Sequence, residues 1–147
     1  MKRLIVCNWK QNIISLAQAR EILDLTNQYL ESRGEDINFS IVICPPAELL
    51  AGVGEILKES HLEHQASLGA QDLVENVPNV RYVIIGHSDR RWGLGESDEI
   101  VNEKLKKTLT GGLIPIVCVG EKVQDDRLIF GLGLGNQRLR IRGPFNQ

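Results

Sequence analysis

The alternation of short β-branched runs with longer amphipathic stretches most constrains the fold of this chain. Apolar residues at steps of three and four predict helices at residues 15–33, 47–59 and 97–110. Short apolar runs predict strands at residues 4–7, 39–43, 82–85 and 116–119, with a weaker strand at 66–70. Strands separated by helices are typical of a parallel α/β sheet.

Two segments depart from this pattern. Residues 71–80 are at the short limit for a crossover between parallel strands, which takes about 10–12 residues, so we expect a loop or a single turn there. Residues 131–147 hold three arginines and no acidic residue. Within residues 138–142, arginines alternate with Leu and Ile, so this segment is either an edge strand or a disordered tail. We therefore expect one α/β domain over residues 1–125 and a divergent Gly/Arg-rich tail over 126–147.

Charge and hydropathy exclude several classes of protein. A net charge of −2 gives the chain no general attraction to nucleic acid or to anionic membranes. No apolar run approaches the roughly 20 residues that span a bilayer. The basic start, Met1–Arg3, precedes only a short apolar run, so a signal peptide is not expected and the chain is expected in the cytoplasm. Cys7, Cys44 and Cys118 lie in or just after apolar runs, as reduced core thiols do.

Three polar segments each follow a predicted strand. They are Asn8-Trp9-Lys10, the segment Gly86-His87-Ser88-Asp89-Arg90-Arg91 with Glu96 nearby, and Cys118-Val119-Gly120-Glu121. Ligands of parallel α/β sheets bind beyond the carboxyl ends of the strands, so the three segments are expected to form one site.

The residue types suggest roles within this site. Lys10 is a cation that could hold an anionic substrate, and His87 could act as an acid, a base or a neutral donor. Asn8 could orient either group. Ser88, Asp89, Arg90, Glu96 and Glu121 are expected to support them, the charged ones through ion pairs. No residue spacing indicates a metal site, and no cofactor is expected.

These segments resemble the triosephosphate isomerase family. The longest similar segment, Tyr82–Arg91, is highly specific, and Cys44-Pro45-Pro46 and Gly69-Ala70-Gln71-Asp72 resemble further strand ends of the family. The resemblance covers about residues 3–125. It implies an α/β fold of the TIM-barrel type, here an incomplete barrel of about five parallel strands with flanking helices.

The resemblance also implies an activity, the interconversion of dihydroxyacetone phosphate and glyceraldehyde 3-phosphate in glycolysis and gluconeogenesis. Lys10 would stabilise the negative charge of a phosphorylated triose, with Asn8 beside it, and His87 would polarise the carbonyl. The family is itself the established example of a histidine kept neutral by a helix N-terminus while a glutamate removes the proton.

Several family features have no match in this sequence. The catalytic glutamate follows the sixth strand in the family, and residues 128–147 contain neither Asp nor Glu. The phosphate-binding glycine loops after strands seven and eight are also unmatched, and position 89 is Asp where the family has Glu. We therefore expect weak isomerase activity, or alternatively a non-catalytic, self-associating half-barrel.

The expected sheet also bears on assembly. Residues 71–86 are too few to form the family's protruding loop, which inserts into the neighbouring subunit. An incomplete barrel leaves inward side chains uncovered and two strand edges unpaired. We therefore expect a homo-oligomer that forms through the open sheet.

Overall fold

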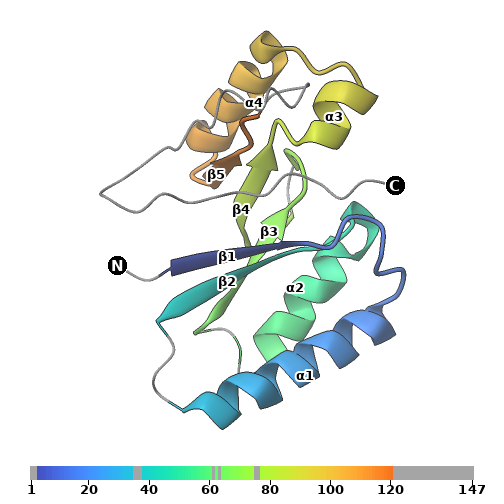
Figure 1. The fold of residues 1–147 in the computed structure, drawn as a ribbon, viewed down its shortest axis with the longest axis vertical. Coiled ribbons are helices and arrows are strands. Elements are labelled where there is room, and N and C mark those ends of the chain that lie inside the picture. The colour runs from blue at the N-terminus through green and yellow to red at the C-terminus, as the bar shows by residue number, and fades with distance from the viewer. Residues whose placement is uncertain (1–2, 35–37, 61, 63, 75–76, 121–147) are drawn as a thin grey trace, which may run out of the picture.

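The fold is a single curled sheet with helices against its outer face (Figure 1). The computed structural model describes residues 3–34, 38–60, 62, 64–74 and 77–120. The sheet within these residues has five parallel strands in the order β1-β2-β3-β4-β5. The strands are β1 (Arg3–Asn8), β2 (Phe39–Cys44), β3 (Ala66–Ala70), β4 (Val80–Ile85) and β5 (Ile114–Val117). This confirms the predicted incomplete TIM-type barrel.

Three of the helices lie where the periodicity predicts them, and a fourth, short helix follows His87, where the periodicity predicts none. They are α1 (Leu16–Arg33), α2 (Leu50–Glu59), α3 (Ser88–Gly93) and α4 (Asp98–Thr110), and a 3₁₀ turn, Ala47–Leu49, precedes α2. Ser15 caps α1 by accepting a hydrogen bond from the Gln18 amide at 3.2 Å, and Gly34 ends it at φ 67°. The described residues between β3 and β4 form bends and a turn, as the short spacing predicts.

The last described strand begins and ends two residues before its predicted position. The sequence pattern predicts a strand at 116–119, but β5 spans Ile114–Val117 and so includes Pro115. The Cys118 amide, just after the strand, donates to the Ile85 carbonyl at 2.8 Å. Since peptide groups alternate sides along a strand, Pro115 faces away from β4, where its missing N–H breaks no sheet hydrogen bond.

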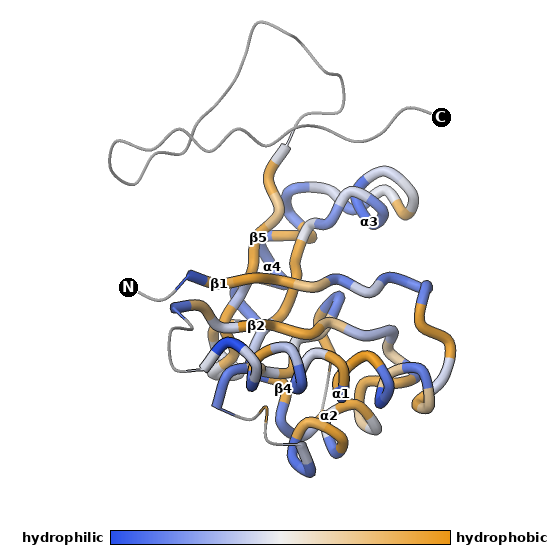
Figure 2. Tube along the Cα trace, turned by 60° about the horizontal axis from the view of Figure 1, so that its bottom comes forward, coloured by the Kyte–Doolittle hydropathy of each residue, from blue (hydrophilic) through white to orange (hydrophobic). Residues whose placement is uncertain are grey.

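The main core lies between the sheet and its helices. Buried side chains there include Leu23 of α1, Val53 of α2, Leu68 of β3 and Ile85 of β4. The strands are the most continuous apolar segments of the chain, whereas α1 and α4 alternate apolar and polar residues (Figure 2). Strands that are buried on both faces of a sheet are apolar at nearly every position, which explains the near-continuous apolar runs in the sequence.

A smaller apolar cluster covers the inner, concave face of the sheet. Val42, Cys44 and Ile84 on the middle strands are buried there, because the curl of the sheet brings them together. Gly69 permits this curl, since a Cβ at that position would lie 2.6 Å from the Cys44 Sγ. The expectation that inward side chains stay uncovered is therefore wrong for the middle strands. It holds at the edges, where Leu4 of β1 and Ile114 of β5 are exposed.

Candidate functional site

The candidate site begins at Lys10, which directly follows β1 in an unusual conformation. Lys10 has φ 50°, a value that non-glycine residues seldom adopt. Two polar contacts hold it: its amide donates to the Asn8 Oδ1 at 2.9 Å, and its carbonyl accepts from the Gln71 Nε2 at 3.0 Å. The same Gln71 nitrogen donates to the Cys44 carbonyl at 3.0 Å. Gln71 therefore ties the ends of β1, β2 and β3 together.

His87 lies two residues after β4 and caps α3 with its own side chain. Its Nδ1 accepts a hydrogen bond from the Asp89 amide at 3.3 Å. A ring nitrogen that accepts an N–H carries no proton, so in the neutral tautomer that makes this bond the proton is on Nε2. The orientation of the His87 ring is thus coupled to the first turn of α3.

Asp89 joins the two halves of the site. One carboxylate oxygen lies 3.3 Å from the Lys10 Nζ and 3.5 Å from the His87 Nδ1. Both Lys10 and Asp89 are more than half exposed, so the ion pair contributes little to stability and can open to a ligand. Lys10, Asp89 and His87 thus lie together, as the sequence analysis predicts for one site at the carboxyl ends of the strands.

A partly buried ion-pair network links α3 to α4 and to the end of β3. The Arg90 guanidinium contacts the Glu96 Oε1 and the Asp72 Oδ2, each at 2.7 Å. Lys104 of α4 contacts the same two carboxylates. Asp72 and Lys104 belong to this network although the sequence analysis gave them no role. Asp72 and Lys104 are 32 residues apart in the sequence, so no local pattern indicates that they pair.

Glu96 has the most perturbed environment of the acidic groups in this network. Burial by itself raises its pKa, but hydrogen bonds from Lys104 and Arg90, and their charges, outweigh burial, so the pKa of Glu96 lies below its ordinary value. Its second carboxylate oxygen, Oε2, is buried without a hydrogen-bond partner. Glu96 thus holds Arg90 and Lys104 and is largely buried from any ligand.

The other predicted residues have simpler positions. Ser88 is the first residue of α3. The Arg91 Nε donates a hydrogen bond to the Gly86 carbonyl at 3.2 Å, which links α3 to the preceding turn. Glu121 lies outside the described residues. Trp92 of α3 is 53 % exposed.

The cysteines are free, and only Cys44 is fully buried. Burial, with a smaller contribution from Cys7, raises the pKa of Cys44 to about 12. Cys7 and Cys118 are half-buried, which corrects the expectation of three core thiols, and burial raises the pKa of each. All three pKa shifts oppose the thiolate form that nucleophilic cysteines need.

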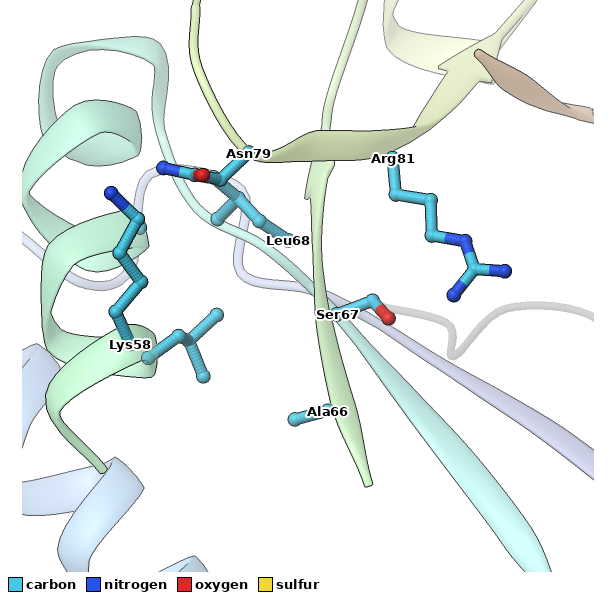
Figure 3. Close-up of a pocket in the computed structure, with 8 residues that line it drawn as sticks. Lys58, Ala66, Ser67, Leu68, Asn79 and Arg81 are labelled. Atoms are coloured by element: carbon cyan, nitrogen blue, oxygen red, sulfur yellow. The ribbon is translucent and has the colours of Figure 1, made fainter. Parts of the chain in front are cut away.

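Two small cavities flank the sheet. The first, of about 200 Å³, lies at the amino-terminal ends of β3 and β4, far from Lys10 along these strands, and is lined in part by Lys58, Asn79 and Arg81 (Figure 3). Lys58 is already ion-paired with Glu55 at 2.8 Å. The second, of about 180 Å³, adjoins Lys10 and lies between Gln11–Ile14 and Pro46–Leu49. Only the second is placed to serve the candidate site.

The described part of the chain contains neither a metal-ligand cluster nor a membrane-spanning helix. No group of three or more His, Cys, Asp or Glu side chains there is arranged to hold a metal ion. No helix among the described residues is long and apolar enough to cross a membrane.

Comparison with known proteins identifies relatives. The family model described as triosephosphate isomerase matches residues 3–128. A triosephosphate isomerase from Gluconacetobacter diazotrophicus is 38% identical over 133 residues, which cover 82% of this chain and 52% of the relative. One from Aquifex aeolicus is 34% identical over 136 residues, covering 85% of this chain and 53% of the relative. The chain thus spans about half the length of the curated relatives it matches.

Proposed function

The chain belongs to the triosephosphate isomerase family, and on this premise we propose that it binds a phosphorylated triose beside Asn8, Lys10 and His87. We propose further that it interconverts dihydroxyacetone phosphate and glyceraldehyde 3-phosphate slowly, as a glycolytic and gluconeogenic reaction in the cytoplasm. The observation that carries this proposal is the convergence of Lys10, Asp89 and His87 on the same edge of the sheet.

Each residue has a role in the proposed reaction. The Lys10 ammonium would exchange its exposed partner Asp89 for the negative charge of the substrate. The neutral His87 imidazole would donate from Nε2 to the substrate carbonyl and stabilise the charge that develops on oxygen. Asn8 would keep Lys10 in its left-handed conformation through the bond to the Lys10 amide.

The proposed activity is weak because proton abstraction needs a positioned base. Among the described carboxylates near the site, Glu96 is held by Arg90 and Lys104, and Asp89 lies beside the His87 Nδ1, not the Nε2 that would meet the substrate. A general base typically contributes about 10²–10⁴-fold to the rate, so turnover without one falls by at least that factor. Binding of the triose phosphate does not depend on the base.

A coupled assay for dihydroxyacetone phosphate formation tests the proposal. We expect a slow rate that Lys10→Ala and His87→Ala abolish, while Lys58→Ala leaves it unchanged. Lys58 is the matched control, since its side chain is 51% exposed and also ion-paired, against 52% for Lys10. A rate that survives both site substitutions would come from a contaminant and would refute the enzymatic proposal.

The second candidate is a non-catalytic, self-associating half-barrel. The exposed apolar side chains on the two edge strands favour it. Absence of turnover, together with absence of Lys10-dependent binding of dihydroxyacetone phosphate in a calorimetric titration, would decide for this candidate. Binding without turnover would instead support the proposed ligand site and refute only the proposed isomerisation.

A further inference from the structure

Among the residues that the structure describes, no strand pairs with the backbone groups on the outer edge of β1. The Arg3 amide donates to the Asn38 carbonyl and the Trp9 amide to the Cys44 carbonyl, so the odd-numbered peptide groups of β1 face β2. The groups of Leu4, Val6 and Asn8 therefore face away from β2.

The opposite edge of the sheet is a poorer template. β5 has four residues, and its outward groups belong to Pro115 and Val117. Because proline has no N–H, Val117 supplies the single outward donor of β5, whereas β1 supplies three. A proline on an edge strand is a common protection against strand addition. Pairing by strand addition is thus favoured at β1 over β5.

We propose that β1 is a dimerisation surface and that two copies of this chain pair antiparallel along it, with Val6 on the twofold axis. In this register Val6 lies opposite Val6 of the second copy, and Leu4 lies opposite Asn8. The twofold axis repeats the second pair as Asn8 opposite Leu4. The three residue pairs use every outward-facing backbone N–H and C=O of the strand and form about six backbone hydrogen bonds. The proposal holds whether or not the chain turns over substrate.

The side chains of β1 suit this symmetric pairing. Leu4, Ile5 and Val6 are 46%, 45% and 36% exposed although they lie in the middle of a strand, and pairing would cover part of that apolar surface. Arg3 is the one charged residue of β1 and would face Trp9 of the second copy, so no like charges oppose each other. A self-complementary edge gives a closed twofold dimer, the commonest soluble assembly.

Light scattering over a concentration range measures the mass of the full chain in solution. We expect twice 16.4 kDa. Val6→Lys places two ammonium groups face to face on the twofold axis, so we expect the mass to fall to that of one chain. The matched control is Val117→Lys, at a similarly exposed position on β5, which should leave the dimer intact. A wild-type monomer at all concentrations, or a dimer that only Val117→Lys disrupts, would overturn the proposal.

A disulfide cross-link tests the register and does not depend on how well the Val6 variant folds. In the proposed register Ile5 lies opposite Cys7 of the second copy in a pair that is not hydrogen-bonded, where Cα atoms are about 4.5 Å apart. Oxidised Ile5→Cys protein should run as a covalent dimer on a non-reducing gel, and adding Cys7→Ser should abolish it. An Ile5→Cys protein that stays uncross-linked while dimeric would refute the register.

Discussion

At the scale of single residues, Gln71 is the side chain that joins the most backbone segments of the site. Its Nε2 donates to the carbonyls of Lys10 and Cys44, each at 3.0 Å. Gln71→Leu removes both hydrogen bonds, so we predict a loss of about 1–2 kcal/mol of unfolding free energy and weaker binding of dihydroxyacetone phosphate. Urea unfolding and calorimetry measure the two effects. Gln28→Leu, on the exposed face of α1, is the control and should change stability by less than about 0.5 kcal/mol.

Glu96 gives a prediction for acid stability. Its pKa is lower in the folded chain than in the unfolded one, so its contribution to stability is present above about pH 4.5, the ordinary value, and is lost as the pH falls through the folded pKa. Glu96→Gln leaves Arg90 and Lys104 with Asp72 as their shared carboxylate partner and should cost about 3 kcal/mol at pH 7.

Urea midpoints between pH 3 and pH 7 check this prediction. The difference between wild type and Glu96→Gln should shrink as the pH falls below about 4.5. Glu55→Gln, at an exposed ion pair with Lys58, should follow the wild-type curve. A constant difference across the whole range would contradict the assigned pKa shift.

At the scale of elements, α3 depends on contacts at its ends. It has six residues and no buried side chain, too little for an independent helix. Arg90 ties it to Glu96 and Asp72, while Arg91 ties it to the Gly86 carbonyl and to Asp98. Because His87 caps α3, these ion pairs also set the position of the imidazole.

Two glycines that flank this element give a matched pair of substitutions. Gly86 has φ 70°, and a Cβ there would lie 3.1 Å from the Arg91 Nε, so Gly86→Ala should cost about 1–2 kcal/mol and shift the His87 ring resonances. Gly93 ends α3 with open space around it, so Gly93→Ala should stabilise by about 0.5 kcal/mol and leave His87 unchanged. Denaturant unfolding and NMR measure both. Equal effects at the two positions would show that α3 does not depend on the Gly86 turn.

The sequence predicts most of these elements because their signals are local. Ser15 begins α1 by accepting a hydrogen bond with its side chain, and Gly34 ends it at φ 67°, which glycine adopts easily because it has no Cβ. The boundary of β5 was mispredicted because Pro115 normally argues against a strand, and only the position of β5 at an edge makes it acceptable. The pairing of Asp72 with Lys104 is invisible in the sequence because it joins residues on separate elements.

At the scale of the whole molecule, the two buried clusters of the described residues are formed mainly by α1, β2, α2, β3, β4 and α4. Every buried residue in them lies between Ala19 and Val101. We therefore predict that a chain cut after residue 125 unfolds at the same temperature as the full chain, within about 2 °C. Thermal unfolding by circular dichroism measures this. A large loss of stability would mean that residues 126–147 belong to the domain.

Local patterns in the sequence predict four of the five strands, the three longer helices, the family resemblance, and the edge of the sheet at which Asn8, Lys10 and His87 lie. These follow from periodicity and from the rule that parallel strands end on one side, which need no knowledge of packing. The folded structure is needed to see that Gln71 holds Lys10, that Asp72 and Lys104 complete the network around Arg90, and which peptide groups of β1 face no described strand. Those features depend on distances between residues far apart in the chain, which the curl of the sheet sets.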